Sequence, residues 1–269
     1  MVATSGIVTL LTDFGTQDAY VGAMKGAALT ANPGIRLVDI SHDIKPQDVM
    51  QAAFVLRDSA QYFPAGTVHL CVVDPGVGSD RAPIAVRQGS HFYVGPDNGL
   101  FSLVLDHDPD EAVILDSADF WRVPHPSNTF HGRDVFAPAA AILASGVPLS
   151  KLGSPLPRLT PLHWALPIRD DQGIRGWVVH VDRFGNCITN ITRDDFIGGR
   201  SGRRFKCYAG TVILNHVHTA YASVEGGDPV LLFNSTDLLE VAVSRGHAAE
   251  LYGLRTGSPI NVVFQDGQG

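Results

Sequence analysis

The chain has 269 residues, of which 45% are hydrophobic and 17% charged, and its formal net charge is −7. This length allows one large domain or two ordinary ones, and the apolar content predicts a sizeable core. Lysine and arginine form no cluster, which excludes a nucleic-acid surface because phosphate binding needs a basic patch. No apolar run approaches the roughly 20 residues of a membrane span and no signal-peptide pattern is visible, so we expect a cytoplasmic protein without a membrane partner. Its three cysteines are far apart and form no CxxC spacing, which predicts reduced structural thiols.

Residues 7–145 alternate between strand and helix patterns. Short apolar runs predict strands, and apolar spacings of three and four residues predict helices. The strands are expected at residues 7–12, 36–40, 67–73, 84–86, 91–94 and 112–115, and the helices at residues 18–31, 48–62, 100–105 and 135–145. In the first helix, five small residues are expected to share one face: Ala19, Gly22, Ala23, Gly26 and Ala27. This alternation predicts an α/β domain with a mostly parallel sheet.

A proline-rich segment, residues 148–167, follows this half and indicates a linker. Beyond it the chain consists of short strand patterns punctuated by glycines, at residues 173–181, 186–191, 204–207, 211–214, 229–233, 240–243 and 259–264. Such a pattern is typical of a small antiparallel barrel or sandwich. We therefore predict an α/β catalytic domain at residues 1–165 and a smaller antiparallel β-barrel domain at residues 166–269.

The strand at residues 67–73 delivers a carboxylate onto a glycine-rich turn. Asp74 follows the strand directly, and Asp80 and Arg81 close the turn. Open α/β sheets build their sites in the crevice beyond the carboxyl ends of their strands. The Asp74–Arg81 pair therefore forms either a structural ion pair or a holder for a small polar nucleophile such as water.

Two further positions in this half carry the same ambiguity. Asp13 follows the first strand, where its carboxylate either accepts two hydroxyls, such as a ribose diol, or caps the next helix. His131 lies in the polar loop at residues 129–134, where it either orients water or is an ordinary surface residue. Asp134, in the same loop, is consistent with a helix cap. The combination of His131 with a separate Asp–Arg turn favours a functional cluster.

The second half carries a pattern that suits a nucleoside. In the turn at residues 182–186, Phe184 either stacks on a purine that Asn186 hydrogen-bonds, or the segment is only a β-turn. The segment at residues 234–237 is likewise a turn or a polar clamp.

Evidence for a metal or a common nucleotide fold is weak. His216 and His218 share one strand face, but no third ligand stands at a recognisable spacing, which disfavours zinc. The patterns GxGxxG, GxxxxGK[ST] and GxSxG are absent.

Seven motifs, taken in order, resemble one family, the S-adenosyl-L-methionine (SAM) hydroxide adenosyltransferases. These are also called adenosine-forming SAM hydrolases and are related to the fluorinase and chlorinase. The motifs are Leu11-Thr12-Asp13-Phe14-Gly15, Ile40-Ser41-His42-Asp43-Ile44, Val73-Asp74-Pro75-Gly76-Val77-Gly78, Pro96-Asp97-Asn98-Gly99, Thr129-Phe130-His131-Gly132-Arg133-Asp134, Asp182-Arg183-Phe184-Gly185-Asn186 and Asn234-Ser235. The resemblance spans residues 7–264, and the ordered set is more specific than any one motif.

The resemblance implies an enzyme that cleaves SAM with water into adenosine and methionine, without a cofactor or metal. It implies an N-terminal α/β domain, a C-terminal β-barrel, and a homotrimer whose sites lie between neighbouring subunits. It places a water-handling triad at Asp74, Arg81 and His131. The substrate contacts that it implies are Asp13 for the ribose diol, Phe184 and Asn186 for adenine, Ser235 near the adenine, Tyr221 along it, and Asp182 near the methionine ammonium.

The chain differs from the fluorinase at three positions that bear on the reaction. The fluorinase carries tyrosine where this chain has Asp74, tryptophan where it has Gln47, and serine where it has Gly132. These changes remove halide-pocket groups and supply the hydrolase triad. A halide adenosyltransferase is the alternative enzyme, and a non-catalytic adenosine or SAM sensor is the alternative from a different class.

Overall fold

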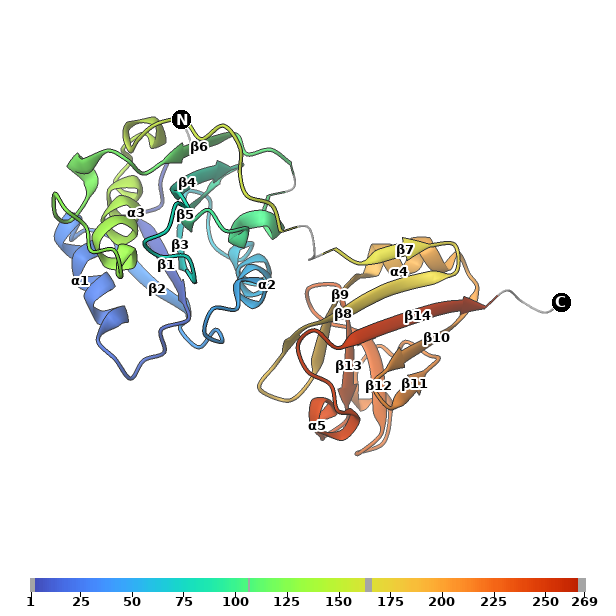
Figure 1. Ribbon diagram of the computed structural model, residues 1–269. Helices are drawn as coiled ribbons and strands as arrows, with labels where there is room; N and C mark the ends of the chain where they lie inside the picture. Colours follow the sequence, from blue (N-terminus) through green and yellow to red (C-terminus); the bar gives the residue numbers. More distant parts are fainter. Residues whose placement is uncertain (1–2, 106, 163–165, 266–269) are drawn as a thin grey trace. The chain divides into compact units, whose positions relative to one another are not determined.

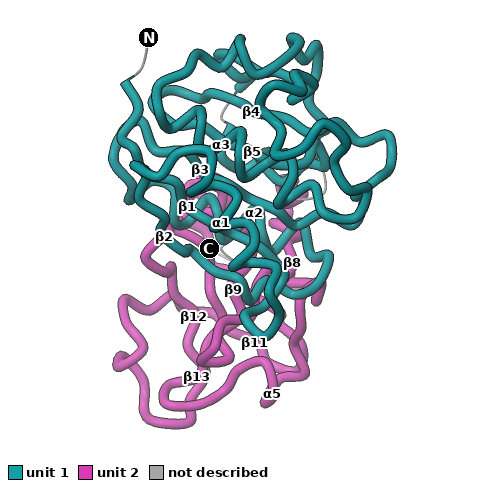
Figure 2. Tube along the Cα trace, turned by 90° about the vertical axis from the view of Figure 1, so that its left-hand side faces the viewer, with its two compact units in different colours: residues 1–162 teal, residues 163–269 magenta. Residues whose placement is uncertain are grey.

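The computed structural model describes residues 3–105, 107–162 and 166–265. The chain forms two compact units, residues 1–162 and residues 163–269, which Figure 2 colours separately. The domain boundary that the sequence predicts after residue 165 falls at residues 163–165, which lie outside the described residues.

Unit 1 is built on a six-stranded mixed sheet with the order β2-β1-β3-β5-β4-β6. Its strands are β1 (Ile7–Thr12), β2 (Arg36–Ser41), β3 (Val68–Val72), β4 (Pro83–Gln88), β5 (His91–Pro96) and β6 (Glu111–Ile114). Strands β2, β1, β3 and β5 pair in parallel, whereas β4 runs antiparallel to both of its neighbours. The sheet is therefore mostly parallel, as the alternating pattern predicts.

Helices cover both faces of this sheet. Helices α1 (Tyr20–Ala31) and α3 (Ala137–Ala144) lie on one face, and α2 (Val49–Ala60) lies on the other (Figure 1). Each face has its own apolar core. Strand β1 leads through α1 to β2 on one side, and β2 returns through α2 to β3 on the other, so right-handed crossovers place the two helices on opposite faces. The carboxyl ends of β1 and β3 therefore flank a topological switch point, where such folds bind ligands.

The buried side of α1 is not centred on its small-residue face. The buried residues are Val21, Met24, Ala27 and Ala28, while Gly22 and Gly26 are exposed. The larger side chains of Val21 and Met24 gain more from burial than glycine does, and they turn the helix accordingly.

The helix expected at residues 135–145 begins differently from a regular α-helix. A π-helical turn, η3 (Gly132–Phe136), precedes α3 and carries the loop of His131 into the helix. Such turns are rare and frequently occur at functional sites. The remaining short helices of unit 1 are the 3-10 turns η1 (Leu100–Leu103), η2 (Ala118–Phe120) and η4 (Leu149–Lys151).

The proline-rich segment is not a free linker along most of its length. Leu149 and Leu152 are buried, and the backbone N–H of Leu156 donates to the Ala112 carbonyl at 2.9 Å. The Thr160 N–H donates to Asp97 Oδ1 at 2.9 Å. Prolines suit this segment because it follows the sheet edge without needing every backbone donor.

Unit 2 is an eight-stranded sheet whose named strands all pair antiparallel, with one isolated parallel bridge between His218 and Leu232. Its strands are β7 (Ile168–Asp170), β8 (Gly173–Val181), β9 (Cys187–Thr192), β10 (Arg204–Ala209), β11 (Val212–Leu214), β12 (Pro229–Phe233), β13 (Leu238–Val243) and β14 (Pro259–Gln265). The first half of β8 pairs with β14 and the second half with β9. The end strands β11 and β12 contribute to one core through Leu214 and Leu231, so the sheet curls into a barrel-like layer.

The strand pattern of the sequence did not predict two helices of unit 2, α4 (Arg193–Arg200) and α5 (Ala248–Tyr252). Thr192 caps α4 by accepting from the Asp195 N–H at 3.0 Å. Phe196 of α4 packs on the ring of Phe205, with the centroids 5.0 Å apart, and so joins the core. The 3-10 turn η6 (Tyr221–Ser223) lies in the loop before β12.

Candidate functional site

Asp74 and Arg81 form a shielded pair at the switch point of unit 1. Their side chains are only 6% and 9% exposed. Arg81 Nε donates to Asp74 Oδ1 at 2.9 Å, and Arg81 Nη2 makes a second short contact with Asp74 Oδ2. The guanidinium also lies 5.3 Å from the centre of the Phe136 ring. This bidentate geometry fixes the orientation of both groups.

Glycines in the intervening turn let it approach the histidine loop. A Cβ on Gly78, whose φ is +78°, would lie 2.6 Å from the carbonyl oxygen of Asn128. A side chain at this position would therefore push the turn away from the loop that carries His131. Ser79 Oγ closes the turn by donating to the Gly76 carbonyl at 2.6 Å.

His131 joins the pair through the same arginine. Arg81 Nη2 lies 2.9 Å from His131 Nδ1, and because a guanidinium only donates, Nδ1 must be the acceptor and the neutral ring carries its proton on Nε2. Burial, followed by the positive charge of Arg81, lowers the pKa of His131 below its ordinary value of 6.5. The three residues that the sequence singles out thus lie together. Arg81 stands between Asp74 and His131, and the imidazole of His131 is neutral.

Asp134 anchors the loop that presents His131 and does not act as a helix cap. Its side chain is 1% exposed, and its two oxygens accept from Arg122 Nε at 2.6 Å, Arg133 Nε at 2.7 Å and the Ser127 N–H at 3.0 Å. Hydrogen bonding by Arg133 is the main reason that the pKa of Asp134 lies far below its usual range. From within η3, Asp134 therefore holds the preceding loop at two points, Arg122 and Ser127.

Replacing Asp134 by Asn is expected to destabilise the protein by about 2–4 kcal/mol, because the buried charged hydrogen bonds are lost while the partly exposed arginines can turn to water. Asp110→Asn is a matched control, since Asp110 pairs with Arg87 from a side chain that is 35% exposed, and it should cost less than about 1 kcal/mol. Chemical denaturation measures both. Equal effects of the two substitutions would show that Asp134 is not an anchor.

Asp13 lies at the end of β1 and is bound by the loop that follows β2. Its Oδ2 accepts from the Gln47 N–H at 2.7 Å. Helix α1 has no side-chain cap, so the alternative in which Asp13 caps that helix is wrong. Burial, with a smaller contribution from the charge of Asp74, raises the pKa of Asp13. The two carboxylates at the ends of β1 and β3 are thus close enough to interact.

In unit 2, the turn at residues 182–186 holds an aromatic ring away from the core. Asp182 Oδ1 accepts from the N–H groups of Phe184 and Asn186, each at 2.9 Å, and its Oδ2 accepts from Asn186 Nδ2 at 3.0 Å. The Phe184 side chain is left 74% exposed. A Cβ on Gly185 would collide with the ring of His247, so the turn requires glycine there. Asp182 therefore shapes the turn. The amino group of Asn186 is bound to Asp182, which leaves the amide oxygen of Asn186 to accept a hydrogen bond from a ligand.

Tyr221 lies over a buried acid that the sequence did not single out. Its hydroxyl donates to Glu240 Oε1 at 2.7 Å, and Glu240, on β13, is 2% exposed. Burial raises the pKa of Glu240, and the hydrogen bond from Tyr221 offsets only part of this effect. An acid inside the apolar strand 238–243 is the signal that could have identified it, because unpaired acids are almost never fully buried. Ser235 lies exposed in the turn between β12 and β13, which Asn234 Oδ1 shapes by accepting from the Leu238 N–H at 3.0 Å.

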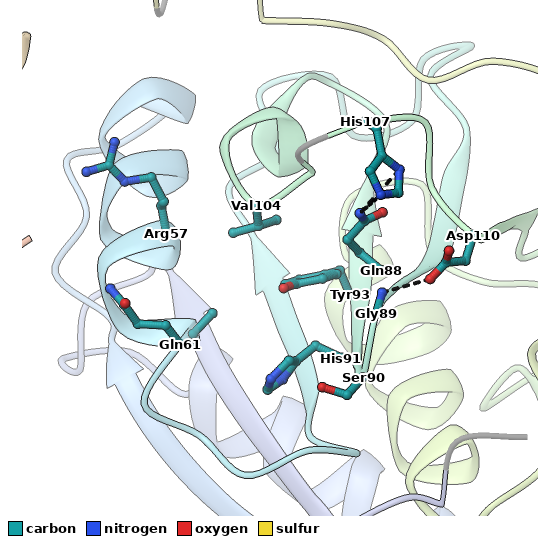
Figure 3. Close-up of a pocket in the computed structure, with 11 residues that line it drawn as sticks. Arg57, Gln61, Gln88, Gly89, Ser90, His91, Tyr93, Val104, His107 and Asp110 are labelled. Carbon is teal, nitrogen blue, oxygen red and sulfur yellow. Dashed lines mark hydrogen bonds between the residues drawn. The ribbon is translucent and has the colours of Figure 1, made fainter. Parts of the chain in front are cut away.

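A pocket of about 550 Å³ lies at the amino end of β5, the opposite end of the strands from Asp74 (Figure 3). Its lining includes Gln61, Gln88, His91 and Tyr93, and none of its lining residues belongs to the predicted site. This pocket is therefore separate from the cluster of charged groups at the switch point.

The alternative metal pair and the cysteines have no part in this cluster. The rings of His216 and His218 lie 4.6 Å apart, but within residues 3–105, 107–162 and 166–265 no group of three His, Cys, Asp or Glu side chains is placed to hold a metal ion. The cysteines Cys71, Cys187 and Cys207 are free and buried, and burial raises their pKa values. No helix in the described part is long and apolar enough to cross a bilayer.

The chain thus combines a mixed α/β unit, with an acid, an arginine and a histidine at its switch point, and an antiparallel β unit with an exposed aromatic turn. Sequence profiles agree: the SAM hydroxide adenosyltransferase N-terminal domain matches residues 8–153, and the C-terminal domain of the same family matches residues 176–261. The chain therefore belongs to the SAM hydroxide adenosyltransferase family.

Relatives of known name align over nearly the whole chain. An (R)-S-adenosyl-L-methionine hydrolase of Thermus thermophilus is 40% identical, covering 95% of this chain and 99% of its own length. A hydrolase of the same name from Methanocaldococcus jannaschii is 34% identical with 96% of both chains covered. A fluorinase of Actinopolyspora mzabensis is 30% identical, covering 95% of this chain and 96% of its own. Among solved structures, an uncharacterised conserved protein from Thermotoga maritima matches with a TM-score of 0.88 and 33% identity, covering 95% of this chain and 99% of its own.

Proposed function

We propose that this chain hydrolyses SAM to adenosine and L-methionine by attack of water or hydroxide on the ribose C5′. The observation that carries the proposal is the Arg81 guanidinium, which holds Asp74 and His131 while its third nitrogen, Nη1, is buried and has no hydrogen-bond partner within the described residues. An unpaired buried donor is costly unless a ligand completes it, and a water or hydroxide oxygen would do so. The hydrolase relatives at 34–40% identity support the same reaction.

The reaction needs orientation more than acid catalysis. The water oxygen forms a bond to C5′ as the C5′–S bond breaks, and the electron pair of that bond leaves with sulfur as a neutral thioether. The water must lose one proton, which Asp74 accepts or passes to solvent, while Arg81 stabilises the developing hydroxide. His131, with its proton on Nε2, orients the water from the other side. Holding the water in line behind C5′ supplies much of the rate.

The remaining predicted residues suit the rest of the substrate. Asp13 is a carboxylate available to a ribose diol, and the exposed Phe184 ring suits stacking on adenine. Asn186 has an amide oxygen for the adenine amine, because its amino group is already bound to Asp182. We assign Ser235 and Tyr221 to the adenine surroundings and Asp182 to the methionine ammonium.

We further propose that the enzyme is a cytoplasmic homotrimer in which neighbouring subunits complete each site, and that its C-terminal unit is the β-barrel of the family. The resemblance in the ordered motifs is the ground for this assembly, and the match of residues 176–261 to the C-terminal domain of the family supports the assignment of that unit.

Product analysis tests the function. The protein is incubated separately with the (R) and (S) sulfonium epimers of SAM, because the hydrolase relatives carry the (R) epimer in their names. We expect equal amounts of adenosine and methionine, and no 5′-chloro-5′-deoxyadenosine when chloride is added. Gly132 provides no hydroxyl for a halide, and a serine at this position would require Met24 Sδ, 3.1 Å from the added Cβ, to move slightly. A chlorinated product would establish the halide adenosyltransferase, and binding without products would establish a sensor.

Activity should begin to be lost to protonation of His131 with a midpoint below pH 6.5. Neutral His131 accepts a hydrogen bond from Arg81, and its lowered pKa means that protonation requires a pH below its ordinary 6.5. The midpoint of the decline in kcat/KM on acidification should therefore lie below pH 6.5, and protonation of Asp13, whose pKa burial raises, adds to the loss of activity on the acid side. A decline centred at or above pH 6.5 in initial-rate measurements would contradict the neutral role of His131.

A further inference from the structure

His42 belongs to a sequence motif, residues 40–44, that the proposed reaction leaves without a role. It follows β2 and is 6% exposed. Its Nδ1 lies 2.8 Å from the hydroxyl of Thr12, which is the residue before Asp13 and is fully buried. A buried imidazole bonded to a buried hydroxyl beside the candidate ribose acid invites a specific explanation.

The polar groups around His42 form one ordered chain. Lys25 Nζ donates to Asp39 Oδ2 at 2.6 Å, and Asp39 Oδ1 lies 3.1 Å from His42 Nε2. This second contact lies outside the angular range of a good hydrogen bond, so Asp39 acts on the imidazole mainly through its charge. That negative charge favours the proton on Nε2, which leaves Nδ1 to accept from the Thr12 hydroxyl.

The other end of the chain reaches the loop of Asp13. Once Thr12 donates to His42, its oxygen is free to accept from the Phe14 N–H, which lies 3.3 Å away. The Gly15 N–H donates to the carbonyl of His42 itself at 2.8 Å. His42 therefore binds the chain on both sides of Asp13, at Thr12 before it and at Gly15 after it.

The loop that starts at His42 also supplies the direct support of the Asp13 carboxylate. Gln47 donates its N–H to Asp13 Oδ2 from a backbone with φ +68°, which is unusual for a residue with a side chain. Strained backbone of this kind persists only where the surrounding structure fixes it. Two buried residues connect this loop to β1: Ile44 shares an apolar cluster with Leu11, and His42 makes the polar contact with Thr12.

We infer that His42 is a positioning residue, which fixes Asp13 for binding of the ribose hydroxyls by holding the loop after β1 and the loop after β2 in register. This inference rests on the proposed function, in which Asp13 binds the diol. It makes no use of His42 as a proton carrier. It explains why an imidazole and a hydroxyl are buried together at this end of the sheet.

Four variants separate positioning from general support of the fold. Asparagine places an amide near the position of imidazole Nδ1, and glutamine places one near Nε2, so His42→Asn keeps the contact with Thr12 and His42→Gln does not. Thr12→Val removes the hydroxyl without changing the shape, and Thr12→Ser keeps it. We expect His42→Gln and Thr12→Val to raise KM for SAM by about 10-fold or more with a smaller change in kcat. His42→Asn and Thr12→Ser should restore KM to within about threefold of the unsubstituted protein.

Adenosine binding gives a readout that does not depend on turnover. Calorimetry compares the Kd for adenosine with that for 2′-deoxyadenosine, which lacks one hydroxyl of the diol. His42→Gln should weaken adenosine binding and leave 2′-deoxyadenosine binding nearly unchanged. Equal weakening of both nucleosides, or a His42→Asn variant as impaired as His42→Gln, would overturn the inference. If the unsubstituted protein binds adenosine but releases no products from SAM, the proposed function fails while this test still stands.

Discussion

Replacing Asp74 by Asn is expected to lower kcat/KM for adenosine formation by about 100- to 10,000-fold, the range for losing a positioned general base together with its electrostatic partner. The amide keeps the size of the side chain but removes the charge that Arg81 binds through two nitrogens. The water then loses its proton acceptor, and the guanidinium loses its fixed orientation. Steady-state assays with chromatographic detection of adenosine measure the effect.

Asp80→Asn is the matched control for this experiment. Asp80 stands on the same glycine turn, but it is exposed, so its neutralisation should change kcat/KM by less than about threefold. Thermal unfolding of both variants separates loss of chemistry from loss of structure. If Asp74→Asn retains full activity, Asp74 does not handle the water, and the cluster is an ordinary structural ion pair.

Mixing two inactive variants should recover activity, which is the second large effect that we expect. Asp74→Asn removes the chemistry of unit 1, and the double variant Phe184→Ala, Asn186→Ala removes adenine binding by unit 2, where stacking on one base is worth about 1–3 kcal/mol. In a homotrimer whose sites combine unit 1 of one subunit with unit 2 of the next, random reassembly gives about a quarter of the sites two intact halves.

The recovery is measured after the two proteins are dissociated and reassembled together, at a substrate concentration where each alone is inactive. Each variant carried through the same procedure by itself is the control. Light scattering confirms that the trimer forms again. A trimer without recovered activity would show that both halves of each site come from one chain.

The strands of this fold were predictable because their signals are local. The alternation of short apolar runs with helical spacings in residues 7–145 predicted the mostly parallel sheet, and the glycine-punctuated strands predicted the antiparallel half. Helix α4 was hidden because Gly198 and Gly199 look like a turn, although Thr192 is a good cap. The side of α1 that faces the sheet could not be predicted either, because it depends on which side chains fill the core between the helix and the sheet.

The candidate site was predictable where each residue follows a strand end or a recognisable turn, as Asp13, Asp74 and Phe184 do. The contacts that complete it are tertiary and leave weaker traces. Glu240 supports Tyr221 across 19 residues of sequence, and His42 reaches Thr12 across 30. Gln47 donates through its backbone, which any residue carries, so no side-chain pattern marks it.

The central claim is that water attacks the ribose C5′ of SAM at the cluster of Asp74, Arg81 and His131. Turnover in water enriched in heavy oxygen, followed by mass spectrometry of both products, tests it most directly. The label should appear in the 5′-hydroxyl of adenosine and be absent from methionine. Unlabelled adenosine, or a label in methionine alone, would contradict attack of water at C5′.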